Sequence, residues 1–133
     1  MLTETDVIEK LSEYFIQLDY QIIQKLTLRQ KGIDIIAKDV EGTFIYIEAK
    51  GETSGTKNTK RFGRPFNGNQ IWSHVSVALL KSLTTINEQY GKEIRAGMAF
   101  PENHRHLLER IKPSLEKLEL TVYLVSESGV SIL

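Results

Sequence analysis

Residues 32–50 place three charged side chains inside a β-hairpin pattern. Two runs rich in β-branched and aromatic residues, 32–38 and 43–50, flank a short turn that ends in Gly42, and this pattern predicts two antiparallel strands. Besides Lys38, which ends the first run, the charges within these runs are Asp34, Glu48 and Lys50. Because a charged group is costly to bury in an apolar strand, the fold must give these side chains a compensating environment.

Strand geometry predicts how the three charges are arranged. A three-residue loop over residues 40–42, with Gly42 in the left-handed conformation that such loops need, places Asp34 opposite Glu48. The Cβ atoms of such a pair lie about 5 Å apart. Since side chains alternate along a strand, Lys50 falls on the same face as Glu48. Two carboxylates and an ammonium therefore converge.

Two facing carboxylates need compensation, because like charges directly opposite each other destabilise a sheet. A divalent cation such as Mg²⁺ would provide it, since hard cations take one or two carboxylates together with waters and phosphate oxygens. The alternative is an edge hairpin with solvated charges, in which Lys50 simply pairs with Glu48. Apolar residues on both faces of the hairpin favour a central position and hence the cation.

The first element predicted is a helix over residues 3–18, with Thr3 as its N-cap. Glu4 falls on the apolar stripe of this helix, whereas Glu9 and Glu13 point to the opposite side. An inward acidic residue indicates either a functional role or a simple interaction with the helix dipole and water. The stripe itself consists of Val7, Ile8, Leu11, Phe15 and Leu18.

A strand over residues 20–28 follows and leads into the hairpin, so three antiparallel strands come after one helix. A second helix, capped by Asn67 or Asn69, runs to about residue 83. Gln70 and His74 lie one turn apart at one side of its apolar stripe, and the role of His74 stays open. That stripe consists of Ile71, Trp72, Val75, Ala78 and Leu79.

The last third of the chain predicts a strand over residues 93–100 that ends at Pro101, then a third helix with a bend near Pro113. Two strands, 120–125 and 130–133, close the chain. The third helix has a predicted buried face of Leu107, Leu108, Ile111, Leu115 and Leu118. Its first turn is predicted to be solvated and contains His104, Arg105 and His106.

The segment 51–69 lacks apolar periodicity and is dense in Gly, Thr, Ser and Asn. Because it leaves directly from Lys50, it lies beside the carboxylates, where its basic residues could contact phosphates and Phe62 and Phe66 could stack on bases. The alternative is a solvated loop whose aromatic residues cap the core. The basic residues, which we expect to bind nucleic acid, are Lys57, Lys60, Arg61 and Arg64.

An Asp that ends one strand, followed by Glu-x-Lys on the next, resembles the active-site signature of the PD-(D/E)xK nuclease superfamily. In this chain the signature is Asp34 with Glu48-Ala49-Lys50, and Ile33 stands where a Pro usually precedes the Asp. The same departure occurs in GxD variants that resemble Holliday-junction resolvases and related restriction enzymes. The resemblance implies a restriction-endonuclease-like α/β fold with a mixed sheet, and the predicted order of elements matches its αβββαβ core over roughly the first 100 residues.

The resemblance also implies a role for each residue of the signature. Asp34 and Glu48, with the carbonyl of Ala49, would hold Mg²⁺ or Mn²⁺. Lys50 would orient or deprotonate the attacking water and stabilise developing charge, although a base role requires the neutral amine. Members of the superfamily often place a Glu on the first helix, where it joins the metal site, and the matching residue here is Glu4. Some members place a Gln on the helix after the Glu-x-Lys strand, a position that Gln70 matches loosely.

Composition bounds the remaining possibilities. The 133 residues predict a single domain over residues 1–133. Lys plus Arg and Asp plus Glu number 17 each, which argues against a protein that coats DNA electrostatically, although a nuclease needs only a local basic surface. The absence of cysteine excludes disulfides and thiolate metal sites. No apolar run approaches membrane-spanning length, so we expect a cytoplasmic protein without a membrane partner.

These observations predict a Mg²⁺-dependent deoxyribonuclease. A catalytically silent nucleic-acid-binding or assembly module on the same fold is the first alternative, and a small α/β protein without a nucleic-acid role is the second. We expect no separate domain for sequence recognition, so specificity would come from DNA shape, from a partner protein or from a homodimer.

Overall fold

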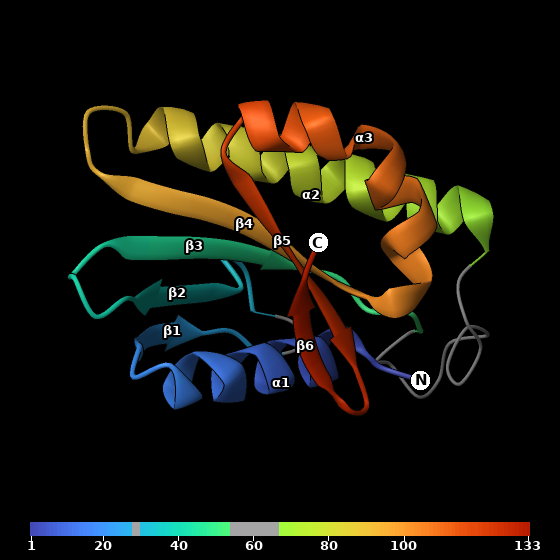
Figure 1. Ribbon diagram of the computed structural model, residues 1–133, viewed down its shortest axis with the longest axis horizontal. Coiled ribbons are helices and arrows are strands. Elements are labelled where there is room, and N and C mark those ends of the chain that lie inside the picture. The colour runs from blue at the N-terminus through green and yellow to red at the C-terminus, as the bar shows by residue number, and fades with distance from the viewer. Residues whose placement is uncertain (28–29, 54–66) are drawn as a thin grey trace.

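A single mixed β-sheet lies between one helix on one face and two helices on the other (Figure 1). The computed structural model describes residues 1–27, 30–53 and 67–133. A short 3₁₀ turn, Glu102–His104, precedes the last helix. In chain order the helices and strands are α1 Glu4–Gln17, β1 Gln21–Lys25, β2 Ile35–Lys38, β3 Phe44–Ala49, α2 Gly68–Glu88, β4 Ile94–Pro101, α3 Arg105–Lys117, β5 Leu120–Ser126 and β6 Gly129–Ile132.

The strands follow one another across the sheet in the order β1-β2-β3-β4-β5-β6. The first three strands are antiparallel, β3, β4 and β5 are parallel, and β6 returns antiparallel to β5. The parallel pairs follow from the crossover helices α2 and α3, because a parallel strand needs such a connection. This arrangement confirms the predicted fold class and is consistent with the restriction-endonuclease-like fold.

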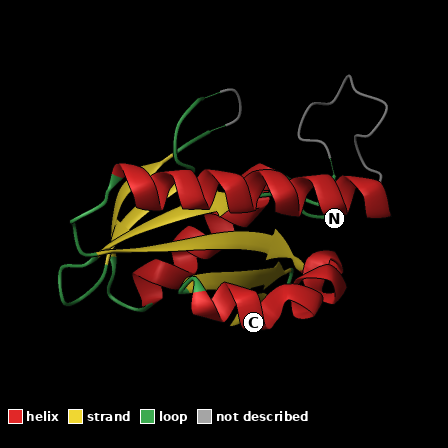
Figure 2. Ribbon diagram, turned by 90° about the horizontal axis from the view of Figure 1, so that it is seen from above, coloured by secondary structure: helices red, strands yellow, loops and turns green. Residues whose placement is uncertain are grey.

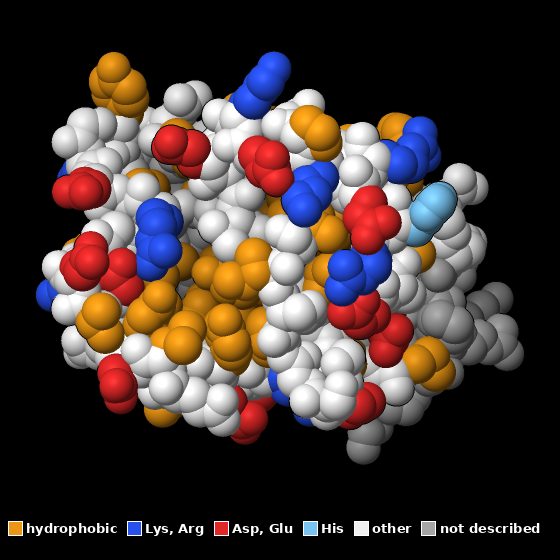
Figure 3. Space-filling view, viewed as in Figure 1, with side chains coloured by type: hydrophobic (Ala, Val, Ile, Leu, Met, Phe, Trp, Pro, Cys, Tyr) orange, Lys and Arg blue, Asp and Glu red, His pale blue; other side chains and the backbone are white. Residues whose placement is uncertain are grey.

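Two hydrophobic cores hold the helices on the sheet. On one face, α1 packs Val7, Leu11 and Phe15, all fully buried, against β2, β3 and β5. On the other face, α2 and α3 lie side by side over β4 and β5 (Figures 1 and 2), and their buried anchors are Val75 and Leu108. Figure 3 shows a hollow lined by apolar side chains on the outer surface of the molecule.

Several predicted boundaries and burial assignments are corrected. Helix α2 continues to Glu88 because Ser82 and Thr85 occupy its buried face while their hydroxyls donate to carbonyls four residues earlier. Trp72 is 58% exposed and does not belong to the core. Two further predicted core residues, Leu18 and Leu118, are C-caps and more than 40% exposed, because the chain leaves the helix there.

The N-cap of α1 agrees with the prediction, since Thr3 accepts the N–H of Asp6 and Asp6 accepts the N–H of Thr3 in return. Pro113 lies inside α3, as the sequence indicates. Within the described ranges, none of the helices combines the length and the apolar composition that a membrane crossing requires.

Candidate functional site

The register of the central hairpin confirms the predicted position of the two carboxylates. Strands β2 and β3 pair Ile35 with Ile47, so the preceding residue of β2 and the following residue of β3 set Asp34 opposite Glu48. Gly42 has a φ of 91°, which is the left-handed conformation that the three-residue loop requires. The local hairpin geometry thus brings the two acidic side chains together.

Both carboxyl groups of this pair are removed from water. Asp34 is 9% exposed and Glu48 is 5% exposed. Asp34 Oδ2 accepts the N–H of Ala49 at 2.8 Å, which fixes its orientation. In contrast, Glu48 Oε2 is buried and has no hydrogen-bond donor among the described residues. The nearest cation to it in that part of the chain is the ammonium of Lys81, whose Nζ lies 3.9 Å away.

The electrostatic environment makes ionisation of Glu48 costly. The pKa of Glu48 is raised to about 7, mainly by burial and then by the charge of Asp34 and a side-chain hydrogen bond with Asp34, whereas Lys81 and Lys50 act in the opposite direction. Two carboxyl groups can share a hydrogen bond only when one of them carries a proton. Near neutral pH the pair therefore needs either a bound proton or another positive group to offset its negative charge.

Glu4 reaches this region because the N-terminal segment packs against the chain that follows β3. Leu2 donates its N–H to Glu52 Oε1 at 2.6 Å, and Glu52 returns its own N–H to the carbonyl of Leu2 at 2.8 Å. A Cβ atom at Gly51 would lie 2.4 Å from the backbone nitrogen of Glu4. Only glycine permits this close approach, so Gly51 sets the position of the start of α1.

The field of the carboxylate pair extends to Glu4. The pKa of Glu4 is raised, first by burial and then by the charge of Asp34, while Lys50 and Lys81 act to lower it. Even so, no group of three or more His, Asp or Glu side chains within the described ranges has a metal-binding arrangement. Among the described residues, Asp34 and Glu48 are therefore the pair that could hold a cation, and Glu4 is a further acidic group outside this pair.

Lys81 is a site residue that the sequence interpretation missed. Gln70, His74 and Lys81 have the spacing i, i+4 and i+11, which puts them on one face of α2. Between residues 68 and 87 the sequence contains one charged residue, Lys81. A single lysine on the same helical face as two other polar residues is a signal that could have identified it.

Gln70 has a local structural partner. Its Oε1 accepts the N–H of Asn67 at 2.7 Å, and Asn67 Oδ1 accepts the N–H of Gln70 at 3.0 Å, which forms a capping box. Asn67 is therefore the N-cap of α2, one of the two predicted candidates. The first turn of α2 holds Gln70 near the end of the segment that follows β3, and any catalytic role for it stays a prediction.

The prediction of a solvated first turn in the third helix is wrong for His104. This residue is fully buried, because it ends the 3₁₀ turn rather than occupying a helix surface. Its ring stacks on Phe100 and on His74, with centroids 5.2 Å and 5.9 Å away. Burial lowers the pKa of His104 to about 4, with a smaller contribution from His74, so its ring is neutral at neutral pH. His74 thus rests on a buried aromatic stack beside the site, and burial lowers its pKa as well.

The basic and aromatic residues of the predicted nucleic-acid-binding segment lie outside the described residues. They are Lys57, Lys60, Arg61, Arg64, Phe62 and Phe66.

Fold and site together define a mixed α/β protein in which the residues of an Asp…Glu-x-Lys signature meet at the ends of neighbouring central strands. Comparison with solved structures gives similar proteins for this arrangement. An XisH family protein from Nostoc punctiforme aligns with a TM-score of 0.59 at 15% identity, and the alignment covers 98% of each chain. A FdxN element excision controlling factor protein from Anabaena variabilis aligns with a TM-score of 0.55 at 16% identity, over 95% of this chain and 96% of that one.

These two similarities establish a shared fold over nearly the whole chain, and identities this low carry no statement about activity. EndoMS in complex with double-stranded DNA aligns with a TM-score of 0.40 at 13% identity, over 83% of this chain and 42% of that one, which is too low to support an inference. No family model and no curated protein sequence matches the chain.

Proposed function

We propose that this chain is a metal-dependent nuclease that hydrolyses phosphodiester bonds in DNA. The observation that carries this proposal is the buried pair Asp34 and Glu48, in which Glu48 Oε2 has no hydrogen-bond donor among the described residues. A buried polar atom without a partner destabilises a fold, and such groups occur where function requires them. A divalent cation between the two carboxylates would supply the partner.

The donor atoms of the site fit a hard divalent cation. Carboxylate and carbonyl oxygens suit Mg²⁺ or Mn²⁺, and the chain has no cysteine to favour a softer metal. Asp34, Glu48 and the carbonyl of Ala49 are the groups that would hold it, with waters and phosphate oxygens as further ligands. When bound, such an ion lowers the pKa of a water molecule and offsets the charge of the phosphate.

The other residues of the site would bind the phosphate and orient the attacking water. Lys50 follows β3 on the face of Glu48, where its ammonium can donate hydrogen bonds to the attacking water and to a phosphate oxygen. In the reaction the water oxygen bonds to phosphorus and releases one proton to solvent, the bond from phosphorus to the leaving oxygen breaks, and that oxygen takes up one proton from solvent. Glu4 would adjust the charge of the site from outside the pair, and Gln70 would offer a neutral amide at the start of α2.

A catalytically silent nucleic-acid-binding module is the second candidate. The contact between Lys81 and Glu48 favours it, because an ammonium at 3.9 Å already offsets part of the buried negative charge without any cation. The two candidates differ in one property, since only the nuclease needs a divalent cation for its activity.

The test uses Asp34→Asn, which keeps an oxygen that can accept the N–H of Ala49 and removes one charge from the pair. Asp19→Asn is the matched control, because Asp19 is exposed and has a φ of 61°, which asparagine tolerates well. Linear, nicked, flapped and branched DNA would be incubated with each protein in Mg²⁺ or Mn²⁺. We expect cleavage by the wild type and by Asp19→Asn, and none by Asp34→Asn.

The same variants separate a metal site from a structural ion pair. Mn²⁺ at about 100 times its Kd should stabilise the wild type by about 2.7 kcal/mol and Asp34→Asn by much less. Without metal, Asp34→Asn should be as stable as the wild type or more stable, since a repulsive charge is lost. A severely destabilised Asp34→Asn, together with no effect of Mn²⁺ on the wild type, would refute the proposal and leave Asp34 as a structural residue that accepts the N–H of Ala49.

A further inference from the structure

The ammonium of Lys81 approaches the buried carboxylate pair from α2. Its Nζ lies 3.9 Å from Glu48 Oε2, and the Lys81 side chain is 52% exposed whereas that of Glu48 is 6% exposed. A hydrogen bond between an ammonium and a carboxylate is normally about 2.7–2.9 Å long. The contact is therefore a charge interaction without a hydrogen bond, and it leaves the donors of Lys81 accessible from solvent.

The position of Lys81 is not explained by solubility. The exposed residues of α2 that precede it are uncharged, although charges there would improve solubility most directly. These exposed residues are Gly68, Asn69, Trp72, Ser73, Ser76, Val77 and Leu80. Lys81 lies instead on the face that carries Gln70 and His74, and the other charged residue of α2, Glu88, is the last residue of the helix. Burial raises the pKa of both Glu48 and Glu4, and Lys81 acts against that rise at both, so its charge acts on both of these carboxyl groups.

A lysine in this position has a defined chemical capacity. An ammonium cannot be a ligand for a metal ion, and it binds phosphate as a compact point charge. Lys81 is half-exposed and makes no hydrogen bond to Glu48 at 3.9 Å, so charge attraction alone holds it there. Its link to Glu48 can therefore be exchanged when another cation takes over the buried negative charge.

We propose that Lys81 binds a backbone phosphate of the nucleic acid and that Glu48 holds its ammonium only while no cation occupies the carboxylate pair. This inference rests on the proposed function, which places a divalent cation at the carboxylate pair. A cation at Asp34 and Glu48 competes with Lys81 for Glu48 and repels the ammonium, which moves outward to a phosphate oxygen. The proposal makes Lys81 a competitor of the cation in the free protein and a substrate ligand in the complex.

These two roles predict effects of opposite sign for Lys81→Met, which removes the charge and keeps the aliphatic stem. In calorimetry without DNA, Mn²⁺ should bind to Lys81→Met several-fold more tightly than to the wild type. With Ca²⁺ in place of Mg²⁺, a duplex DNA oligonucleotide should bind about tenfold more weakly. The plot of log affinity against log salt concentration should also lose about 0.9 of its slope, as expected for one lost phosphate contact.

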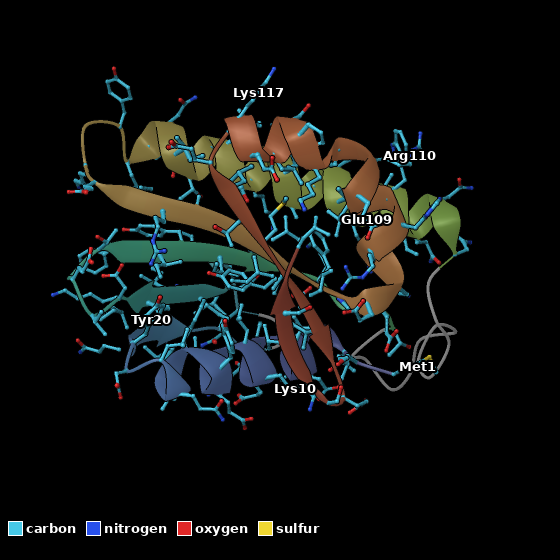
Figure 4. The ribbon with its side chains drawn as sticks, in the orientation of Figure 1. Met1, Lys10, Tyr20, Glu109, Arg110 and Lys117 are labelled. Carbon is cyan, nitrogen blue, oxygen red and sulfur yellow. The ribbon has the colours of Figure 1, made fainter. Side chains whose placement is uncertain are left out.

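Lys117→Met is the matched control. Lys117 is exposed on the outer side of α3 and points away from the sheet (Figure 4), so it loses the same charge without approaching the carboxylates. We expect its affinity for Mn²⁺, its affinity for DNA and its salt slope to equal those of the wild type. Lys81→Arg keeps the charge and should retain the DNA affinity and the slope, and it also tests the role of the charge if Lys81→Met folds poorly.

The proposal is overturned if Lys81→Met has the DNA affinity and salt slope of Lys117→Met, or if its affinity for Mn²⁺ falls. It is also overturned if Lys81→Arg loses DNA affinity to the same extent as Lys81→Met. Failure of the proposed function is a different result, in which the wild type binds Mn²⁺ and DNA but cleaves none of the substrates. In that case the comparison of Lys81→Met with Lys117→Met still decides whether Lys81 contacts phosphate.

Discussion

Glu48→Gln tests the central physical claim, that the fold carries an unfavourable carboxylate at neutral pH. The pKa of Glu48 is raised from 4.5 to about 7, mainly by burial and then by Asp34. A raised pKa means that the folded state binds the proton more tightly than the unfolded state does. The stabilising contribution of the protonated group is therefore fully present below pH 4.5 and is lost as the pH rises to about 7.

The magnitude follows from the two pKa values. Each pKa unit corresponds to about 1.4 kcal/mol, so the interval between 4.5 and about 7 amounts to about 3 kcal/mol. Glutamine has nearly the same shape, and its amide can donate a hydrogen bond to Asp34 at every pH. The free energy of unfolding of Glu48→Gln should therefore exceed that of the wild type by an amount that grows by about 3 kcal/mol between pH 4.5 and pH 8. For a domain of this size the difference corresponds to about 10 °C in Tm.

The assay is urea unfolding in EDTA at a series of pH values from about 4.5 to about 8. Glu13→Gln is the control, because Glu13 is exposed on α1 and its replacement should leave the pH dependence of the wild type unchanged. Saturating Mn²⁺ should reduce the loss of wild-type stability above neutral pH, since the cation offsets the same charge. If the wild type and Glu48→Gln gave parallel curves, Glu48 would ionise without cost and the electrostatic argument for a cation would be refuted.

Two further predictions concern the segments on either side of this pair. In thermal unfolding, Gly51→Ala should lower the free energy of unfolding by about 1–3 kcal/mol. The added Cβ would lie 2.4 Å from Glu4 N and 2.6 Å from Thr3 C. Gly68→Ala is the control and should be neutral or stabilising, because its Cβ would meet nothing within 4 Å. In electrophoretic or fluorescence binding assays, DNA affinity should fall and the salt slope should flatten by about 0.9 for each lost phosphate contact when alanine replaces Lys57, Lys60, Arg61 and Arg64. An unchanged affinity and slope would remove that segment from the nucleic-acid interface.

The site was predictable from the sequence where its geometry is local. The position of Asp34 opposite Glu48 depends on the two-residue period of a strand and on a loop whose length is marked by Gly42, and both are visible over fewer than twenty consecutive residues. The capping of α1 by Thr3 and the order of the elements are local in the same sense. The inward position of Glu4 followed from helical spacing alone.

Burial could not be predicted where it depends on how elements pack. Helical spacing alone assigned Trp72 to the core, yet α2 turns it outward and buries Ser82 and Thr85, whose hydroxyls have partners inside the helix. His104 lies in a polar sequence, yet it is enclosed between Phe100 and His74 because β4, α2 and the 3₁₀ turn meet there.

The sequence by itself determined the hairpin, its register, the meeting of two carboxylates and the αβββαβ order, because each depends on short-range periodicity and turn chemistry. The tertiary structure decided which other groups reach the pair. Lys81 is more than thirty residues from Glu48 in the sequence, and the packing of α2 on the sheet brings its Nζ to 3.9 Å from Glu48 Oε2. Gly51 likewise acquires its importance only when the start of α1 lies against it. Long-range contacts of this kind arise from the packing of whole elements, which no local pattern encodes.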